Sequence, residues 1–302
     1  MSKRKKINDE VPFILKHRTR GEKILYAFVF FILFIWALTF LIPGVWLVIQ
    51  SLHDQWGYYV AISFDGPFAI PDVLHFENYI KTFSMLDANG VNYGGMLLNT
   101  LWYMVLAIFY CPIWTVITSY VFSKYKFRGR EFLYALIIFA MVIPIVGTGG
   151  ARYKLIADLK LDDSGPLYVL ATGIGGFSGS FLIMYGIFKN ISWSYAEAVF
   201  IDGGGHFTAF LRIMLPQALP AISVLLLDSA IDLWNESHTF IMYLPSTPTI
   251  ATGLYYAQAA IKRFGYPLYY AGIVMSIVPP IIVFAINSDF MMRSLSIGGL
   301  KG

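Results

Sequence analysis

Six long apolar runs alternate with shorter polar stretches along the chain. The runs cover residues 24–49, 96–122, 132–148, 167–188, 221–244 and 269–290. A helix needs about 20 apolar residues to cross the hydrocarbon core of a bilayer, where every backbone polar group must be bonded internally. The pattern therefore predicts an all-α integral membrane protein with six transmembrane helices. Among the runs, 132–148 is the shortest and 221–244 is the most polar.

The overall composition agrees with this pattern and removes other classes of protein. Apolar residues make up 57% of the chain and charged residues 13%, whereas soluble domains carry about 25% charged residues. Cys111 is the single cysteine, so no disulfide can form within the chain. The first run follows a basic stretch, as in a signal peptide, but it is too long and lacks a small-x-small cleavage site. We interpret it as a retained anchor.

The distribution of basic residues predicts the orientation. If both termini are cytoplasmic, 16 of the 22 Lys and Arg residues fall in inside segments and six in outside segments, as the positive-inside rule favours. The chain then divides into a basic cytoplasmic N-terminus (1–23), a six-helix domain (24–290) and a cytoplasmic tail (291–302). Within the domain, 50–95 is the longest outer segment and 190–220 the longest inner one. The basic N-terminus would lie on the anionic headgroups of the lipid bilayer.

The inner segment 190–220 has an unusually regular pattern. Residues 195–202 fit a short helix, and the glycines 203–205 interrupt it, because glycine makes helix continuation costly. Residues 206–214 fit a second short helix that ends at Leu215–Pro216, and Pro220 opens the next apolar run. The prediction is a compact helix–turn–helix on the cytoplasmic side.

The residue spacing of this segment resembles the EAA loop of the membrane subunits of ATP-binding cassette (ABC) importers, written EAA, three residues, G, nine residues, I-x-LP. The matching positions are Glu197, Ala198, Gly203, Ile213 and Leu215–Pro216. Val199 stands at the second alanine and Gly204 replaces the usual small residue after Gly203, which leaves the helix–turn–helix shape intact. The resemblance implies a type I ABC importer permease fold and a multi-pass protein of the bacterial cytoplasmic membrane.

The same resemblance implies how the loop acts: it docks in a cleft on a cytoplasmic ATPase, whose motion swings the membrane helices between outward and inward openings. Glu197 is the candidate for an ion pair with a basic residue of the ATPase, and Ala198 permits close approach. Gly203 permits the sharp turn, and Asp202 is expected to cap that turn or the second helix through backbone N–H groups. The apolar docking face comprises Phe207, Ile213 and Leu215, followed by Pro216.

Two further elements resemble sugar permeases of the maltose-transporter type. Trp234-Asn235-Glu236 matches their W-N-E/D element, and 296–302 is similar to the Gly-Gly-x-Lys-Gly ending of the smaller permease subunit. The similarity extends over 24–302 and is nearest to the branch that imports oligosaccharides or polysaccharide fragments. It implies that the tail contacts the ATPase pair through Gly298, Gly299, Lys301 and Gly302.

The family resemblance also implies the partners. They are a second homologous permease subunit in a heterodimer, two copies of a cytoplasmic ABC ATPase, an extracytoplasmic solute-binding protein and a sugar substrate, but no nucleic acid. The chain has no GxxxxGK[ST] motif to cradle ATP phosphates. We therefore expect no enzyme activity, catalytic residue, cofactor or metal in this chain, with ATP and Mg²⁺ bound by the ATPase. The outer segment 50–95 is either a folded connector or a contact for an external partner.

Four polar residues of the fifth run fall on one helical face. At 100° per residue, Asp228, Asp232, Asn235 and Glu236 form a stripe about 100° wide. Acids facing lipid at a helix centre would each cost about 2.5–3.5 kcal/mol, so these face the bundle interior or water. Either they line a translocation pathway and accept hydrogen bonds from sugar hydroxyls, or they hold helices together.

Three other functions fit some of these residues. A proton-driven transporter would use Asp228, Asp232 and Glu236 as a relay, but it leaves the cytoplasmic helix–turn–helix unexplained. An intramembrane enzyme would add His238 and a metal, yet Glu236 and His238 lie about 200° apart on a helix, and no HExxH or Ser/Lys pattern is present. A structural membrane scaffold is the third. An importer permease explains the most residues.

Overall fold

The computed structural model describes residues 20–143, 147–173 and 178–298. These residues are mostly helical, with one two-stranded antiparallel hairpin among them. Within this part of the chain, four helical segments are long and apolar enough to cross a membrane: Arg20–Ser51, Tyr93–Lys124, His206–Trp234 and Tyr266–Ala285. They correspond to the first, second, fifth and sixth predicted spans.

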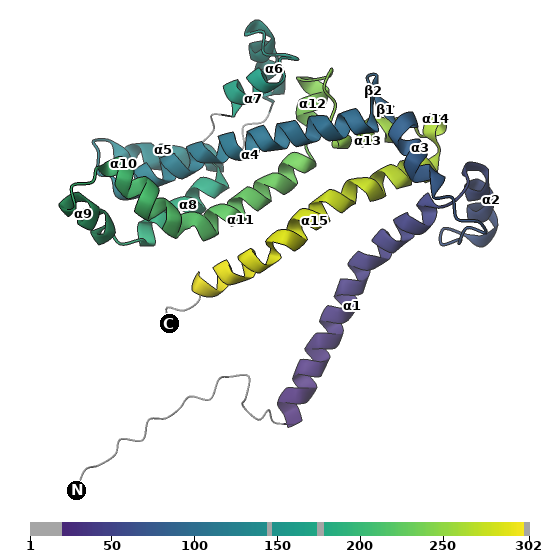
Figure 1. The fold of residues 1–302 in the computed structure, drawn as a ribbon, viewed down its shortest axis with the longest axis horizontal. Helices are drawn as coiled ribbons and strands as arrows, with labels where there is room; N and C mark the ends of the chain where they lie inside the picture. The colour runs from purple at the N-terminus through teal and green to yellow at the C-terminus, as the bar shows by residue number, and fades with distance from the viewer. Residues whose placement is uncertain (1–19, 144–146, 174–177, 299–302) are drawn as a thin grey trace.

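The long helices are arranged around α4 (Tyr93–Lys124), which runs the length of the bundle (Figure 1). Helices α8 (Gly179–Asn190) and α11 (Leu215–Trp234) pack along α4, and α15 (Tyr266–Gly298) packs on α11. Helix α1 (Arg20–Ser51) packs on α15 at its C-terminal end and diverges from the bundle toward its N-terminal end (Figure 1). The first 26 residues of α1 are therefore exposed on every side and face lipid or another protein chain.

The third and fourth predicted spans are broken in the structure. Run 132–148 contains α5 (Arg130–Val142), which has 13 residues and is followed by α6 (Gly149–Asp158). Run 167–188 is divided between α7 (Pro166–Thr172) and α8, which has 12 residues. Each piece is shorter than the roughly 20 residues that a straight membrane-spanning helix needs.

A glycine lies beside each break. Gly147, between α5 and α6, has a φ of 84°, a conformation that residues with a side chain rarely adopt. Gly173 ends α7 against α4, where a Cβ atom would lie 2.8 Å from Cys111 Sγ and 3.0 Å from Tyr110 Cδ1. The lack of a side chain at Gly173 therefore lets the end of α7 lie directly on α4.

Short elements gather at the end of the bundle where α4 begins. They are α2 (Gln55–Asp65), α3 (Glu77–Met85), β1 (Asp87–Ala88), β2 (Val91–Asn92), α12 (His238–Met242), α13 (Ile250–Ala259) and α14 (Ile261–Phe264). The strands pair through Asp87 with Asn92 and Ala88 with Val91. A buried cluster joins this cap to the long helices: Leu86, Ala88, Tyr93, Met96, Trp234, Ile250 and Ala257.

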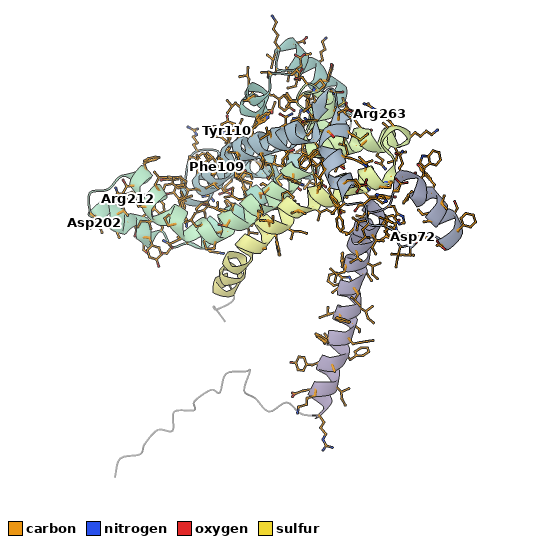
Figure 2. All side chains as sticks on the ribbon, turned by 45° about the vertical axis from the view of Figure 1, so that its right-hand side comes forward. Asp72, Phe109, Tyr110, Asp202, Arg212 and Arg263 are labelled. Carbon is orange, nitrogen blue, oxygen red and sulfur yellow. The ribbon has the colours of Figure 1, made fainter. Side chains whose placement is uncertain are left out.

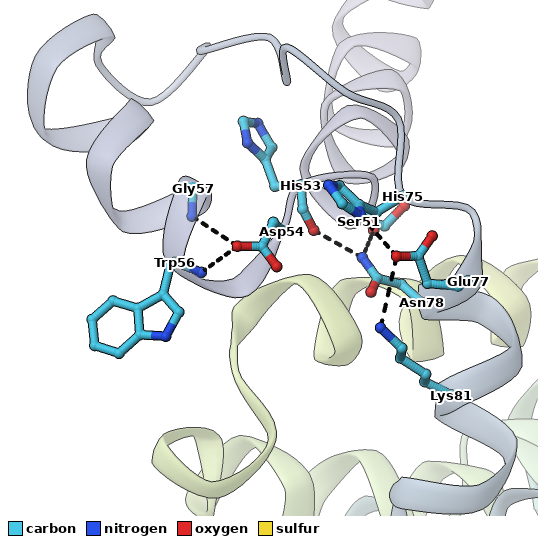
Figure 3. A network of polar contacts seen from close by, with 9 residues as sticks. All are labelled: Ser51, His53, Asp54, Trp56, Gly57, His75, Glu77, Asn78 and Lys81. Carbon is cyan, nitrogen blue, oxygen red and sulfur yellow. Dashed lines mark hydrogen bonds and ion pairs between the residues drawn. The ribbon is translucent and has the colours of Figure 1, made fainter.

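Backbone carbonyls at the end of α1 are bonded by α3 (Figure 3). Asn78 Nδ2 donates hydrogen bonds of 2.8 Å to both Ser51 O and His53 O, and Asn78 is buried. These carbonyls have no partner within α1, because a helix leaves its last carbonyls free. The segment 50–95 is thus a folded connector fastened to the end of α1.

Two acids in this connector are stabilised in their charged forms (Figure 3). Asp54 Oδ2 accepts hydrogen bonds from Gly57 N (3.3 Å) and Trp56 N (3.1 Å), which cap α2 and lower the pKa of Asp54. His75 Nδ1 lies 2.8 Å from Glu77 Oε1, and this hydrogen bond lowers the pKa of Glu77. The polar network keeps both carboxylates ionised on the surface.

The predicted helix break at Leu215–Pro216 is wrong. Helix α10 (His206–Ala209) passes through a π-helical stretch (Phe210–Met214) into α11, so one helix runs from His206 to Trp234. Leu215 N bonds Phe210 O, five residues earlier. A proline ring in an α-helix clashes with the carbonyl four residues before it, and the wider π turn relieves that clash at Pro216.

The last helix is longer than predicted. Helix α15 continues past residue 290 to Gly298, so residues 291–298 of the predicted tail are helical. The chain has no proline or glycine between 281 and 297, and nothing in that stretch stops a helix. The other predicted tail residues, Gly299, Lys301 and Gly302, lie outside the described residues.

Candidate functional site

The predicted helix–turn–helix lies at the end of the molecule opposite α2 and α3 (Figure 1). It consists of α9 (Ser194–Ile201), a glycine turn and α10. Asp202 and Arg212 mark this end in Figure 2, whereas Asp72 and Arg263 lie at the other. The segments predicted as inner and outer are therefore at opposite ends of the bundle.

The turn depends on two glycines. Gly203 has a φ of 82°, the left-handed conformation that ends many helices at glycine. Gly203 N donates to Phe200 O (3.1 Å) and Gly204 N to Val199 O (2.8 Å), which closes the end of α9. A Cβ atom on Gly204 would lie 2.5 Å from Val199 Cγ1. The predicted glycine turn is confirmed, and Gly204 contributes to it as well as Gly203.

The capping role predicted for Asp202 is not found. Asp202 ends α9 through its backbone N–H, which donates to Ala198 O at 3.0 Å. Helix α10 begins after Gly205 and has no side-chain hydrogen bond at its N-terminus. The side chain of Asp202 is exposed, so its carboxylate stands free at the tip of the turn.

Aromatic residues fasten the turn to the end of α4. Tyr125 Oη lies 3.1 Å from His206 Nδ1, and the His206 ring lies against Phe200 with centroids 4.8 Å apart. Lys124 Nζ donates to Ile191 O, just before α9. Sequence reasoning missed Tyr125 and His206, because their pairing is set by the packing of α4 against the loop. The helix–turn–helix is thus held where it begins, at Ile191, and at its turn, by His206.

A buried cluster packs the helix–turn–helix against α4, α8 and α11. Its members are Val116, Tyr120, Met184, Phe188, Ala196, Ala209, Met214, Ala218 and Ile222. The alanine that permits close packing within the chain is Ala196, which is fully buried, whereas Ala198 is exposed. Leu215 packs against this cluster and is therefore directed away from the docking face predicted for it.

The outer side of the helix–turn–helix has no cover within the described residues. Ile201 and Phe207 are 86% and 74% exposed on either side of the glycine turn. Glu197 and Asp202 are also exposed, while Ile213 is half-buried. The sequence analysis missed Ile201, although its place directly before Asp202 and Gly203 could have indicated it. Two large apolar side chains flanked by two acids thus project from a rigid turn.

The polar stripe of the fifth run is divided by the structure. Asp228 and Asp232 lie on α11 and are exposed, on a side that α4, α8 and α15 leave uncovered. Helix α11 ends at Trp234, so Asn235 is its C-cap and Glu236 lies beyond it. The predicted continuation of this helix to residue 244 is wrong, and the four residues do not form one helical stripe.

Asn235 and Glu236 have hydrogen-bond partners within the chain. Asn235 Nδ2 donates to Ile231 O at 2.8 Å. Glu236 Oε1 accepts from Thr239 N at 2.7 Å and so caps α12. In a continuing α-helix Thr239 N would donate to Asn235 O, so its bond to Glu236 Oε1 takes the place of a helical bond.

The geometry offers no arrangement for a bound metal in the part of the chain that the structure describes. There, no three His, Cys, Asp or Glu side chains converge to form a metal site. His238, considered with Glu236 in the enzyme hypothesis, lies in α12 outside the long helix. What the chain presents is an exposed helix–turn–helix at one end and two uncovered acids, Asp228 and Asp232, in the last two turns of the long helix that ends at Trp234.

These features define a helical membrane protein with an exposed helix–turn–helix at one end. The model of the family described as "Binding-protein-dependent transport system inner membrane component" matches residues 114–296, which is more than half of the chain. The chain belongs to this family. It is therefore a multi-pass inner-membrane component of a transport system that works with a binding protein.

Curated relatives and solved structures agree with this assignment. The diacetylchitobiose uptake permease NgcG of Streptomyces coelicolor is 23% identical over 276 residues, covering 89% of this chain and 87% of the relative. The arabinooligosaccharides permease AraQ of Halalkalibacterium halodurans is 24% identical, covering 77% and 81%. A chain of a bacterial ABC transporter involved in alginate import shares the fold with a TM-score of 0.72 at 24% identity, covering 90% of this chain and 98% of that one. The resemblance to ABC importer permeases is confirmed.

Proposed function

We propose that this chain is a permease subunit of an ATP-driven oligosaccharide importer and forms half of the translocation pathway beside a second, homologous permease. The relatives named above are permeases for diacetylchitobiose and arabino-oligosaccharides, and another, from Streptococcus pneumoniae, is a maltodextrin permease. These substrates share hydroxyl-rich rings joined in short chains. The solute-binding protein would deliver such a chain from the outer side.

The observation that carries the proposal is the rigid helix–turn–helix with an uncovered apolar tip. Ile201 and Phe207 would enter a cleft on a cytoplasmic ATPase, and Glu197 would pair with a basic residue at its rim. An exposed apolar tip in water is unfavourable, so a partner of matching shape is stabilising here. Because Tyr125 and His206 hold the turn against α4, a push on the tip moves the bundle.

Six membrane crossings with both termini cytoplasmic complete the topology of the proposal. The helices α5 and α7–α8 would supply the third and fourth crossings as broken helices, which proteins tolerate where neighbouring helices cover the free backbone groups. Support comes from the distribution of Lys and Arg and from the opposite placement of the connector and the helix–turn–helix. The divisions 1–23, 24–290 and 291–302 follow from this topology.

The energy source and the tail belong to the same proposal. Two copies of the ATPase would bind ATP and Mg²⁺, since no phosphate-binding motif is present in this sequence. Gly298, Gly299, Lys301 and Gly302 would contact the ATPase pair. Ala198 would permit close approach of α9 to that partner, because a small side chain on an exposed face keeps two backbones near each other.

Reconstitution tests the proposed function. The complex purified through a tag on this chain is placed in proteoliposomes with its solute-binding protein, and uptake of labelled diacetylchitobiose, arabino-oligosaccharide, maltodextrin and alginate oligosaccharide is measured. We expect uptake of one of these sugars that needs both ATP and the binding protein. Uptake that proceeds without ATP and stops when a proton gradient is collapsed would contradict the proposal and favour the proton-driven alternative.

Asp228 and Asp232 are proposed to line the pathway between the two permeases. They stand one helical turn apart on the uncovered side of α11, where lipid contact would be costly. A water-filled pathway or a second permease removes that cost. Sugar hydroxyls donate hydrogen bonds to carboxylates, and such charge-assisted bonds are the stronger kind.

Replacing Asp232 by Asn is expected to lower sugar uptake about 10-fold or more, because a hydrogen bond to a charged group contributes about 1.5–3 kcal/mol. Initial uptake rates in the proteoliposomes measure this effect. The matched control is Asp65→Asn, which changes an exposed acid of α2 at the outer end and should leave uptake within about two-fold. Unchanged uptake and unchanged sugar-stimulated ATP hydrolysis in Asp232→Asn would remove the residue from the pathway.

A further inference from the structure

Helix α15 contains two adjacent prolines, Pro279 and Pro280. A helical carbonyl normally accepts from the N–H four residues later, or three residues later in a tightened turn. For Ser276 O these donors would be Pro280 and Pro279, and proline has no N–H. For Met275 O the later donor is lost, but Val278 N remains three residues away. Ser276 O is thus the carbonyl that the proline pair deprives of both helical partners.

Trp234 supplies the missing hydrogen bond from a different helix. Its Nε1 donates to Ser276 O at 3.1 Å, and the Trp234 side chain is buried. A buried carbonyl without a partner would cost as much as a lost hydrogen bond. The bond therefore replaces, across two helices, the one that α15 cannot make within itself.

The position of Trp234 connects this bond to the cytoplasmic end. Trp234 is the last residue of α11, and the helix that it ends begins at His206, directly after the glycine turn. A displacement of the helix–turn–helix is transmitted along this single helix to the indole group. At the far end of the bond, the two prolines make α15 easy to bend, since a proline kink lacks the bonds that keep a helix straight.

A cavity beside the bond leaves room for bending. It has a volume of about 370 Å³ and lies between α4, α11 and α15, with Trp234, Pro279 and Pro280 in its wall. Its other lining residues are apolar, among them Met104, Ala230 and Phe284. The cavity is partly open at the surface of the bundle, since Leu101, Ile281 and Phe284 of its lining are exposed. Close-packed helices resist movement, so this apolar space beside the proline pair is where α15 can bend with the least displacement of its neighbours.

We propose that the Trp234–Ser276 hydrogen bond is the joint through which movement of the ATPase-coupled helix His206–Trp234 bends α15 at its proline pair. Trp234 is a positioning residue in this scheme and does not contact the sugar. The inference rests on the proposed function, because it assumes that an ATPase moves the helix–turn–helix. The proposal also gives a reason for a tryptophan directly before Asn235 and Glu236. At the last position of α11, the indole N–H can reach Ser276 O on α15.

A double-mutant cycle tests the hydrogen bond. Trp234→Phe removes the indole N–H and is expected to lower the unfolding midpoint of the purified complex by about 2–8 °C. Pro280→Ala returns an N–H for Ser276 O, so in that background Trp234→Phe should lower the midpoint by less than half as much. Pro279→Ala restores an N–H for Met275 O at the four-residue spacing and, for Ser276 O, only at the weaker three-residue spacing. It should therefore rescue much less than Pro280→Ala. Equal losses in all three backgrounds would show that Trp234 only fills space.

Nucleotide-driven bending tests the joint itself. Spin labels at Leu219 on α11 and Ser288 on α15, in a Cys111→Ala chain, report the distance between the helices in the assembled complex with and without ATP and vanadate. We expect the distance to change in the parent chain and the change to fall by more than half in Trp234→Phe. The control is Trp46→Phe, which also loses an indole N–H bond, to Pro67 O at 2.6 Å. Trp46 packs on Tyr270 of α15 but does not bond Ser276 O, so this variant should keep the full change.

The outcomes separate the joint from the proposed function. If Trp234→Phe keeps the full nucleotide-driven change, or if the parent chain shows no change while ATP-driven uptake is intact, the joint is wrong and the importer function stands. If the parent complex shows no ATP-dependent uptake of any sugar, the proposed function fails, and the joint fails with it because no motor drives the helix.

Discussion

Replacing Gly203 by Pro is expected to abolish ATP-driven uptake, with a loss of more than 100-fold. Proline fixes φ near −65°, whereas Gly203 has a φ of 82°, and proline also removes the N–H that donates to Phe200 O. A proline that opposes the backbone in this way costs about 3 kcal/mol or more. Without the turn, Ile201 and Phe207 no longer project together. Uptake and ATPase co-purification measure the effect.

Alanine substitutions at two neighbouring glycines provide the control for this prediction. Gly203→Ala keeps the N–H but still opposes the left-handed backbone, at about 1–2 kcal/mol, so uptake should fall about 10-fold. Gly205→Ala meets no atom within 4 Å and has a φ of −94°, so uptake should stay within about two-fold. Equal uptake in the two alanine variants would show that the turn geometry does not matter.

Phe207→Glu is expected to separate the ATPase from the membrane subunits. Phe207 is 74% exposed in this chain and is buried only when a partner covers it, so the substitution leaves the fold intact but places an unpaired carboxylate in the interface. An uncompensated buried charge costs about 3–5 kcal/mol, which corresponds to an affinity loss of more than 100-fold. The amount of ATPase that co-purifies with the tagged chain measures the loss.

The matched variant for this experiment is Val73→Glu, which introduces the same charge at an exposed apolar residue of the connector 50–95. It should leave ATPase binding unchanged, because it lies at the opposite end of the bundle. ATPase binding that survives Phe207→Glu would place the docking surface elsewhere. Binding lost in both variants would point to a general effect of added charge rather than to the tip.

The sequence predicted the features that depend on local chemistry. Four long apolar runs form the membrane-length helices, because an apolar stretch of that length has few alternatives. The turn at Gly203 follows from three successive glycines, and its place between α9 and α10 is as predicted. The spacing of Glu197, Gly203 and Ile213 indicated the family, because it matches the EAA loop of ABC importer permeases.

The features that sequence reasoning missed depend on tertiary packing. Leu215–Pro216 has the composition of a helix end, but the π-helical stretch before it accommodates the proline, and the helix continues. The helix break after Trp234 coincides with side-chain bonds of Asn235 and Glu236 that no apolar pattern reveals. Likewise, Trp234 and Ser276 are 42 positions apart, and nothing local relates them. Side-chain orientation, such as burial of Ala196 instead of Ala198, also required the packed structure.

The π-helical stretch Phe210–Met214 sets the direction, around the helix axis, in which the side chains of α11 point. A π turn arises when an α-helix accommodates one additional residue, and each residue of an α-helix advances the direction by about 100°. If Phe210–Met214 lost one residue and became regular, Asp228 and Asp232 would swing by about that angle, toward neighbouring helices or lipid. A single residue near the helix–turn–helix thus sets the direction of two carboxylates that lie several turns away.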